Sequence, residues 1–113
     1  MAMVETKEGL DNLDAICATP GLDAVYIGPA DLSFALGLPP QADNPDPVHL
    51  QTCDRIRESA HKHGIKAVMH CASADFAAGA VERGFDMVML TSDLHSMIAG
   101  VNAQLSAFKA KTG

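Results

Sequence analysis

The sequence predicts an α/β fold made of four consecutive strand–helix units. Short apolar, β-branched runs alternate with longer segments in which apolar residues recur at helical spacing. Strands that alternate with helices pair in parallel through right-handed crossovers. Two architectures fit this order: a four-stranded doubly wound sheet, or four consecutive units of a (β/α)8 barrel. The chain of 113 residues is expected to form one domain, residues 1–113, which is about half of a barrel that needs roughly 250 residues.

The first unit begins with a very short apolar segment, residues 1–5, which leads into Glu5. Thr6 is a suitable N-cap for a helix from Lys7 to about Ala18, and Pro20-Gly21 ends that helix. The apolar residues of this helix fall on one face, namely Leu10, Leu13, Ile16 and Cys17.

The second unit contains the most strand-like run of the chain, Asp23 to Ile27. Gly28-Pro29 ends this strand, and residues 31–36 are expected to form a short helical turn. A loop rich in proline, asparagine and aspartate follows over residues 37–47, and Asp46 with Pro47 begins a helix that runs to about His63. Its inward residues are predicted to be Leu50, Cys53, Ile56 and Ala60.

The last two units repeat the same pattern. A third strand is predicted over residues 65–69, followed by a helix over residues 74–83 that Ser73 caps. A fourth strand is predicted over residues 85–90, followed by a final helix from about Asp93 to Lys109. The final helix carries apolar residues at spacings of three and four, which predicts an inner stripe of Leu94, Ile98, Val101, Leu105 and Phe108.

The composition argues against several classes of partner. The formal net charge of −6 opposes binding to nucleic acid or to an anionic membrane surface, and no apolar run approaches membrane-spanning length. Apolar residues make up 48% and charged residues 19%, as in ordinary globular proteins. The cysteines, Cys17, Cys53 and Cys71, are odd in number and lack C-x-x-C spacing, which predicts reduced thiols in a cytoplasmic protein.

Two carboxylates are predicted at the same edge of the sheet. Glu5 follows the first apolar segment and Asp31 follows the next strand, and ligands of parallel α/β proteins bind at the carboxyl ends of strands. Two carboxylates that converge repel each other unless a cation or a proton lies between them. Hard oxygen ligands suit Mg²⁺ or Mn²⁺. On spacing alone, the alternatives are a helix-capping role for Asp31 and a solvated acid at Glu5.

Further polar residues follow the third and fourth strands. His70 is a candidate for substrate contact or proton transfer, and a polar strand end without a fixed role is the alternative. Cys71 is expected to be a packing residue, and Thr91-Ser92 reaches the same edge. His49, near the start of a helix, is expected on the surface.

A series of short motifs runs through the first third of the chain. In order they are Val4-Glu5-Thr6, Asn12-Leu13, Pro20-Gly21-Leu22-Asp23, Ile27-Gly28-Pro29-Ala30-Asp31-Leu32-Ser33 and Gly37. The series resembles the HpcH/HpaI aldolase family, and a weaker resemblance continues to the C-terminus. The resemblance implies the second half of a (β/α)8 barrel that cleaves hydroxy-keto acids to pyruvate and an aldehyde with a divalent metal ion.

The resemblance also implies roles for individual residues. Glu5 and Asp31 would be the protein ligands of the metal, Mg²⁺ or Mn²⁺. Gly28, Pro29, Ala30 and Asp31 would surround the carboxylate of a pyruvate-type keto acid, held by backbone N–H groups. The metal would stabilise the enolate that forms when the carbon–carbon bond breaks.

Two alternatives stay open at this point. The family's general-base histidine and enolate-stabilising arginine lie in the first half of the barrel, so a half-barrel that folds and oligomerises without catalysis is one alternative. Decarboxylation of oxaloacetate, or cleavage of citryl or malyl thioesters, is the other. Unpaired sheet edges and an exposed apolar face predict a homo-oligomer in either case.

Overall fold

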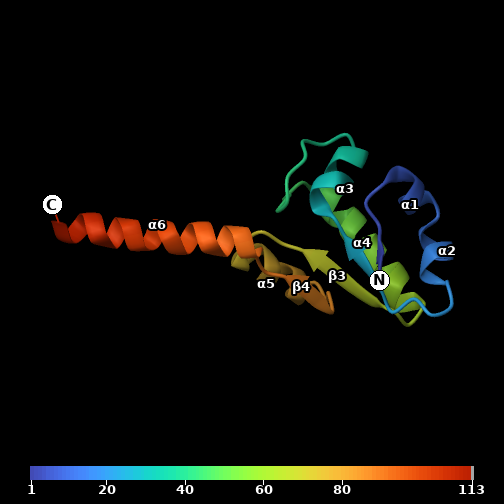
Figure 1. Cartoon of the computed structure of the whole chain (residues 1–113). Coiled ribbons are helices and arrows are strands. Elements are labelled where there is room, and N and C mark those ends of the chain that lie inside the picture. The colour runs from blue at the N-terminus through green and yellow to red at the C-terminus, as the bar shows by residue number, and fades with distance from the viewer. Residues whose placement is uncertain (113) are drawn as a thin grey trace.

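The computed structural model describes residues 1–112, and its centre is a parallel four-stranded sheet (Figure 1). The strands stand in the order β1-β2-β3-β4, which is also their order along the chain. Their bounds are Ala2–Met3, Ala24–Ile27, Lys66–His70 and Met87–Met89. A doubly wound sheet would reverse its strand order at a switch point, whereas consecutive order is that of a barrel segment. The predicted α/β fold is confirmed, and the order favours the barrel architecture.

Six helices connect and follow the strands within the described residues. They are α1 (Lys7–Asp11), α2 (Leu13–Cys17), α3 (Pro29–Ala35), α4 (Pro47–Lys62), α5 (Ala74–Glu82) and α6 (Asp93–Thr112). The predicted caps at Thr6, Asp46 and Ser73 each accept a backbone N–H in the first turn of the helix that follows. None of the described helices is both long and apolar enough to cross a membrane.

The hydrophobic core lies on one face of the sheet, beneath the helices. Alternate strand residues point into it, because successive side chains of a strand face opposite ways. From β2 and β3 these residues are Val25, Ile27, Ala67 and Met69, each 1% exposed or less. From α4, Cys53, Ile56 and Ala60 meet them with 0% exposure. The core therefore fastens the sheet to α4 from one side only.

The opposite face of the sheet, termed the open face, is exposed at its two edges, whereas Val68 in its middle is buried. The pairing register places Met3 beside Tyr26, Tyr26 beside Val68, and Val68 beside Met87. At the two edges of this row Met3 is 58% and Met87 51% exposed. This open face carries the cavity described below.

The prediction of a single helix from Lys7 to Ala18 is wrong. The segment forms two helices, α1 and α2, with a break at Asn12. The backbone of Asn12 leaves the helical region (φ −103°, ψ 12°), and its Nδ2 donates to the Glu8 carbonyl over 2.9 Å. Asparagine side chains compete in this way for backbone groups and interrupt helices.

The inner stripe predicted for the last helix is also wrong. Across Asp93–Thr112 no side chain is buried, and α6 extends away from the sheet to the C-terminus (Figure 1). The five stripe residues, Leu94, Ile98, Val101, Leu105 and Phe108, are 47–63% exposed. Helical periodicity shows that a helix has an apolar side, but it does not state which surface covers that side.

His49 is wholly buried, against the expectation that it lies on the surface. It takes the first inward position of α4 in place of Leu50, so the inward series is His49, Cys53, Ile56 and Ala60. Burial lowers the pKa of His49, and hydrogen bonds with the backbones of Pro29 and Asn44 oppose that shift. The backbone groups of Pro29 and Asn44 therefore allow the His49 ring to be buried at the start of the inward face of α4.

A short chain of hydrogen bonds fixes the start of α3 against the loop that follows it. Ser33 Oγ donates to the Pro29 carbonyl over 2.6 Å, and Asn44 Nδ2 donates to Ser33 Oγ over 2.9 Å. Both side chains are buried, where an unpaired polar group would be costly. This network holds the helix start that carries Asp31.

Asp86 ties the beginning of β4 to β3 and α4. It accepts from Lys66 Nζ over 2.8 Å and from the Ala67 N–H over 3.0 Å, and it pairs with His61 Nε2 over 2.8 Å. The Ala67 N–H contributes most to holding the pKa of the Asp86 carboxyl well below its usual range, followed by Lys66.

We expect Asp86→Asn to lower the free energy of unfolding by about 1–2 kcal/mol at pH 7. The ionised form is favoured by folding, so its contribution is complete above the unfolded-state pKa of about 4 and is lost as pH falls through the lowered folded-state pKa. Urea unfolding at pH 7 and pH 3 should show the difference between variant and parent shrinking at pH 3. The exposed Asp11→Asn is the matched control, and an equal loss there would contradict a specific role for Asp86.

Candidate functional site

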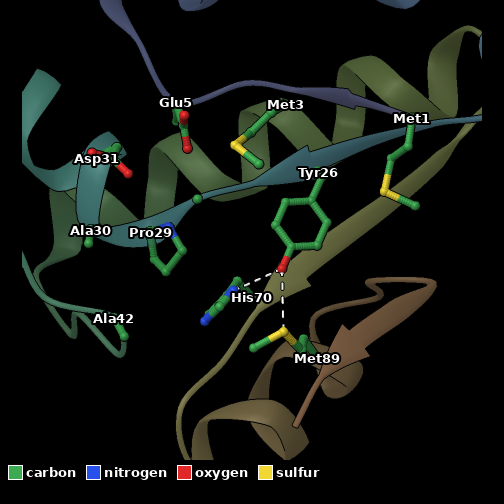
Figure 2. A pocket seen from close by; sticks show the side chains of 11 residues that line it. Met1, Met3, Glu5, Tyr26, Pro29, Ala30, Asp31, Ala42, His70 and Met89 are labelled. Atoms are coloured by element: carbon green, nitrogen blue, oxygen red, sulfur yellow. Dashed lines mark hydrogen bonds between the residues drawn. The ribbon is translucent and has the colours of Figure 1, made fainter. Parts of the chain in front are cut away.

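An open cavity of about 550 Å³ lies on the open face of the sheet, at the carboxyl ends of the strands (Figure 2). Its lining residues come from the start of the chain, from β2 and α3, from the 37–47 loop, and from the ends of β3 and β4. They are Met1, Met3, Glu5, Tyr26, Gly28, Pro29, Ala30, Asp31, Ala42, His70 and Met89. All the residues predicted as site residues, namely Glu5, Gly28, Pro29, Ala30, Asp31 and His70, are in this set.

The carboxylate of Glu5 lies directly against the backbone of Gly28. A Cβ placed on Gly28 would overlap Glu5 Oε2 and would stand 3.1 Å from Glu5 Cδ. The backbone of Gly28 is extended (φ −89°, ψ 99°), so the glycine matters here for the space that it leaves to Glu5 and not for its conformation. The missing side chain lets Glu5 reach across the end of β2.

Asp31 faces Glu5 from the first turn of α3 (Figure 2). Burial raises the pKa of Glu5, and the negative charge of Asp31 raises it further. A bound cation would relieve this repulsion. The described residues contain no cluster of three or more histidine, cysteine, aspartate or glutamate side chains able to hold a metal ion. Two carboxylates leave most coordination positions to water and ligand oxygens, an arrangement that suits Mg²⁺ or Mn²⁺ better than a closed zinc site.

The start of α3 offers backbone donors beside these carboxylates. The N–H groups of the first turn have no acceptor within their own helix, and Pro29 brings no donor. The first intrahelical bond runs from the Leu32 N–H to the Gly28 carbonyl over 2.9 Å. Ala30 and Asp31 therefore present their N–H groups at the edge of the cavity.

The sequence reasoning missed Tyr26, the one tyrosine of the chain, which contacts His70 in the cavity. The Tyr26 hydroxyl lies 2.8 Å from His70 Nδ1 and 3.7 Å from Met89 Sδ, and the Tyr26 and His70 rings meet edge to face (Figure 2). Burial raises the pKa of Tyr26, and Cys71 adds to that shift. Strand alternation was the available signal, because it places Tyr26 opposite the two core residues Val25 and Ile27.

Other residues expected at this edge do not line the cavity. Cys71 is wholly buried within the core, and burial raises the pKa of its thiol to about 11, as expected of a packing residue. Thr91 and Ser92 lie in the turn before α6, where Ser92 Oγ accepts the His95 N–H as a cap. From the ends of β3 and β4, therefore, His70 and Met89 line the cavity.

Comparisons with known proteins agree with this geometry. The sequence matches the HpcH/HpaI aldolase/citrate lyase family over residues 1–100. It is 34% identical to a hydroxypyruvate/pyruvate aldolase of Rhizorhabdus wittichii, covering 97% of this chain and 44% of that protein. It is 37% identical to a 2-keto-3-deoxy-L-rhamnonate aldolase of Salmonella paratyphi B, covering 98% and 43%. The chain thus spans less than half the length of the curated relatives it matches.

A solved structure of similar fold is an HpcH/HpaI aldolase from Desulfitobacterium hafniense DCB-2. It superposes with a TM-score of 0.84 at 28% identity, over 96% of this chain and 42% of that one. The sheet, the strand order and the helices of the described residues therefore have a close counterpart in one part of a longer aldolase.

We expect Gly28→Ala to lower the free energy of unfolding by about 0.5–1 kcal/mol, because the new methyl group displaces the Glu5 carboxylate, the flexible end of a partly exposed side chain. In a Glu5→Ala background most of this cost should disappear, giving a coupling of about 0.5 kcal/mol in a double-mutant cycle measured by urea unfolding. Gly79→Ala is the control, since a Cβ there meets nothing within 4 Å in α5 and should stabilise by about 0.5–1 kcal/mol. Additive effects at Gly28 and Glu5 would contradict the close approach.

Proposed function

The chain belongs to the HpcH/HpaI aldolase/citrate lyase family, and we propose that its cavity binds a divalent metal ion together with a small 2-keto acid. The proposed reaction is carbon–carbon cleavage of a hydroxy-keto acid to pyruvate and an aldehyde, as an aldolase. The activity belongs to proteins more than twice the length of this chain, and the names of two such relatives, the hydroxypyruvate/pyruvate and the rhamnonate aldolases, support the keto-acid class.

One observation carries the proposal: Glu5 and Asp31 converge over a glycine that leaves them room. In this arrangement both carboxylates would hold the ion, Mg²⁺ or Mn²⁺. Such an ion, when bound, stabilises negative charge that develops on a keto oxygen. The N–H groups of Ala30 and Asp31 would hold the carboxylate of the keto acid, and His70 would contact the remainder of the molecule or handle a proton.

Two other readings make different predictions. Decarboxylation of oxaloacetate, or cleavage of citryl or malyl thioesters, would use the same metal and anion site with another leaving group. A catalytically silent fold would bind neither metal nor keto acid. Parallel assays of aldol cleavage and oxaloacetate decarboxylation distinguish these two reactions. The metal titration below distinguishes both reactions from the catalytically silent fold.

We expect Mn²⁺ and Mg²⁺ to raise the melting temperature of the chain and to show saturable binding by calorimetry. Pyruvate should tighten metal binding, because its keto and carboxylate oxygens would fill positions left open by the two side chains. Glu5→Gln and Asp31→Asn should each weaken metal binding at least about tenfold, since each removes one of two charged ligands.

Glu8→Gln is the matched control, because Glu8 is an exposed glutamate in α1 outside the cavity. It should bind metal as the parent does. Absence of divalent binding to a folded sample would refute the proposed site, and equal weakening by Glu8→Gln would show that the effect is one of net charge.

We also propose that copies of this chain associate in solution and that the chain resides in the cytoplasm, where its free, buried cysteines remain reduced. β1 and β4 are open edges of the sheet, and α6 exposes its apolar stripe from Leu94 to Phe108. Apolar surfaces of this extent favour association, and a second copy of the chain presents matching surfaces.

We expect sedimentation velocity to show a homo-oligomer. The double substitution Ile98→Glu/Val101→Glu places two charges within the α6 stripe and should shift the protein toward monomer. Gln104→Glu, which adds charge to the same exposed helix at a polar position, should leave the oligomer unchanged. A monodisperse monomer of the unmodified chain would refute this proposal.

A further inference from the structure

Tyr26 and His70 form a hydrogen-bonded pair on the open face of the sheet. They come from neighbouring strands β2 and β3, with the Tyr26 hydroxyl 2.8 Å from His70 Nδ1. In Figure 2 the other ring nitrogen of His70 points away from Tyr26, toward the space lined by Pro29 and Ala42. Nδ1 of His70 therefore contacts Tyr26, and Nε2 is directed at the cavity.

The acceptors available to Tyr26 decide where the protons lie. The hydroxyl has two neighbours, Nδ1 of His70 at 2.8 Å and Sδ of Met89 at 3.7 Å. A thioether is a weak acceptor and lies at a long distance, whereas an unprotonated imidazole nitrogen at 2.8 Å is a good one. Tyr26 is therefore placed to donate to Nδ1, and in that tautomer the ring carries its proton on Nε2, which faces the cavity.

His70 then supplies a side-chain hydrogen-bond donor at the β3 end of the cavity, away from the backbone N–H groups of Ala30 and Asp31. Of the other ionisable side chains of the described lining, Glu5 and Asp31 accept hydrogen bonds when ionised, the Tyr26 hydroxyl is engaged with His70, and Met1, Met3 and Met89 have nearly apolar side chains. β3 stands two strand spacings, about 10 Å, from β1 and its Glu5 end. That separation leaves room for a metal ion and a short keto acid between the two carboxylates and His70.

We propose that the Tyr26–His70 pair makes the cavity selective for keto acids that carry a hydroxyl group beyond the keto carbon. His70 Nε2–H donates to that hydroxyl oxygen, and Tyr26 is a positioning residue that sets the tautomer and the orientation of the ring. This inference rests on the proposed function, because it takes the keto acid to be held at the Glu5–Asp31 end. The wall around His70 is otherwise formed by apolar side chains such as Met89 and Ala42, so a ligand that leaves the single side-chain donor there unpaired is disfavoured.

Calorimetry with Mn²⁺ and either 3-hydroxypyruvate or pyruvate tests the selectivity on the full chain. We expect 3-hydroxypyruvate to bind about tenfold more tightly than pyruvate. His70→Leu should abolish the preference, His70→Gln should retain part of it through its amide N–H, and Tyr26→Phe should reduce it about threefold. His95→Leu makes the same chemical change on exposed α6 and should keep the full preference.

Long-range ¹H–¹⁵N spectra of the histidine rings at pH 8 test the role of Tyr26 separately. We expect His70, assigned by comparison with His70→Gln, to show an unprotonated Nδ1 that accepts a hydrogen bond. Tyr26→Phe should move that Nδ1 resonance toward the position of a free unprotonated nitrogen. A purely structural role for Tyr26 would change stability without this shift.

The outcomes distinguish the inference from the function beneath it. Equal binding of the two acids, with binding intact, would overturn the selectivity alone. A protonated Nδ1 in the unmodified protein would overturn the donor assignment. Failure of both acids to bind in the presence of Mn²⁺ would overturn the proposed function and, with it, the ligand assigned to His70.

Discussion

The approach of the Glu5 carboxylate to the bare backbone of Gly28 is the contact on which the cavity depends. It forces two negative charges, Glu5 and Asp31, to share the end of β2, and burial of Glu5 makes that proximity costly. Folding tolerates the cost because the core on the other face holds β2 and β3 to α4. The network of Pro29, Ser33 and Asn44 holds the start of α3. The strain of like charges is therefore concentrated where a cation would relieve it.

The two faces of the sheet have different roles: one carries the hydrophobic core and the other carries the cavity. The helix-covered face buries side chains of β2, β3 and α4 to 1% exposure or less, and it supplies the stability. The open face has Met3 at one edge and Met87 at the other. Tyr26 and His70 lie between these edges, on neighbouring strands. In a parallel sheet the side chains of neighbouring strands align in rows. The face that is not needed for stability can therefore gather groups from distant parts of the sequence.

Much of the local structure follows from nearest neighbours along the chain. Thr6, Asp46 and Ser73 cap helices as predicted, because capping is a contact within one turn. Gly64 and Gly84 end α4 and α5 with positive φ values of 74° and 92°, for the same local reason. The break at Asn12 was missed because the helical pattern continues on both sides of it, and a single side-chain bond to Glu8 decides the matter.

Errors of burial had a different origin. His49 looked like a surface residue because histidine near a helix start usually is, yet the backbones of Pro29 and Asn44 meet its ring inside the protein. The α6 stripe looked internal because its spacing is that of a packed helix, yet the helix extends away from the sheet. In both cases burial depends on how the element is placed in the tertiary structure, which the spacing of residues along the chain does not give.

The sequence by itself determined the alternation of strands and helices, the caps at Thr6, Asp46 and Ser73, and the identity of the two acids at one edge. These follow from periodicity, capping and turn chemistry, which act over a few residues. Only the tertiary structure decided that Gly28 makes room for Glu5, that Tyr26 bonds to His70, and that α6 stands apart from the sheet. Those features depend on strand register and on contacts between distant segments, and no spacing along one chain encodes such distances.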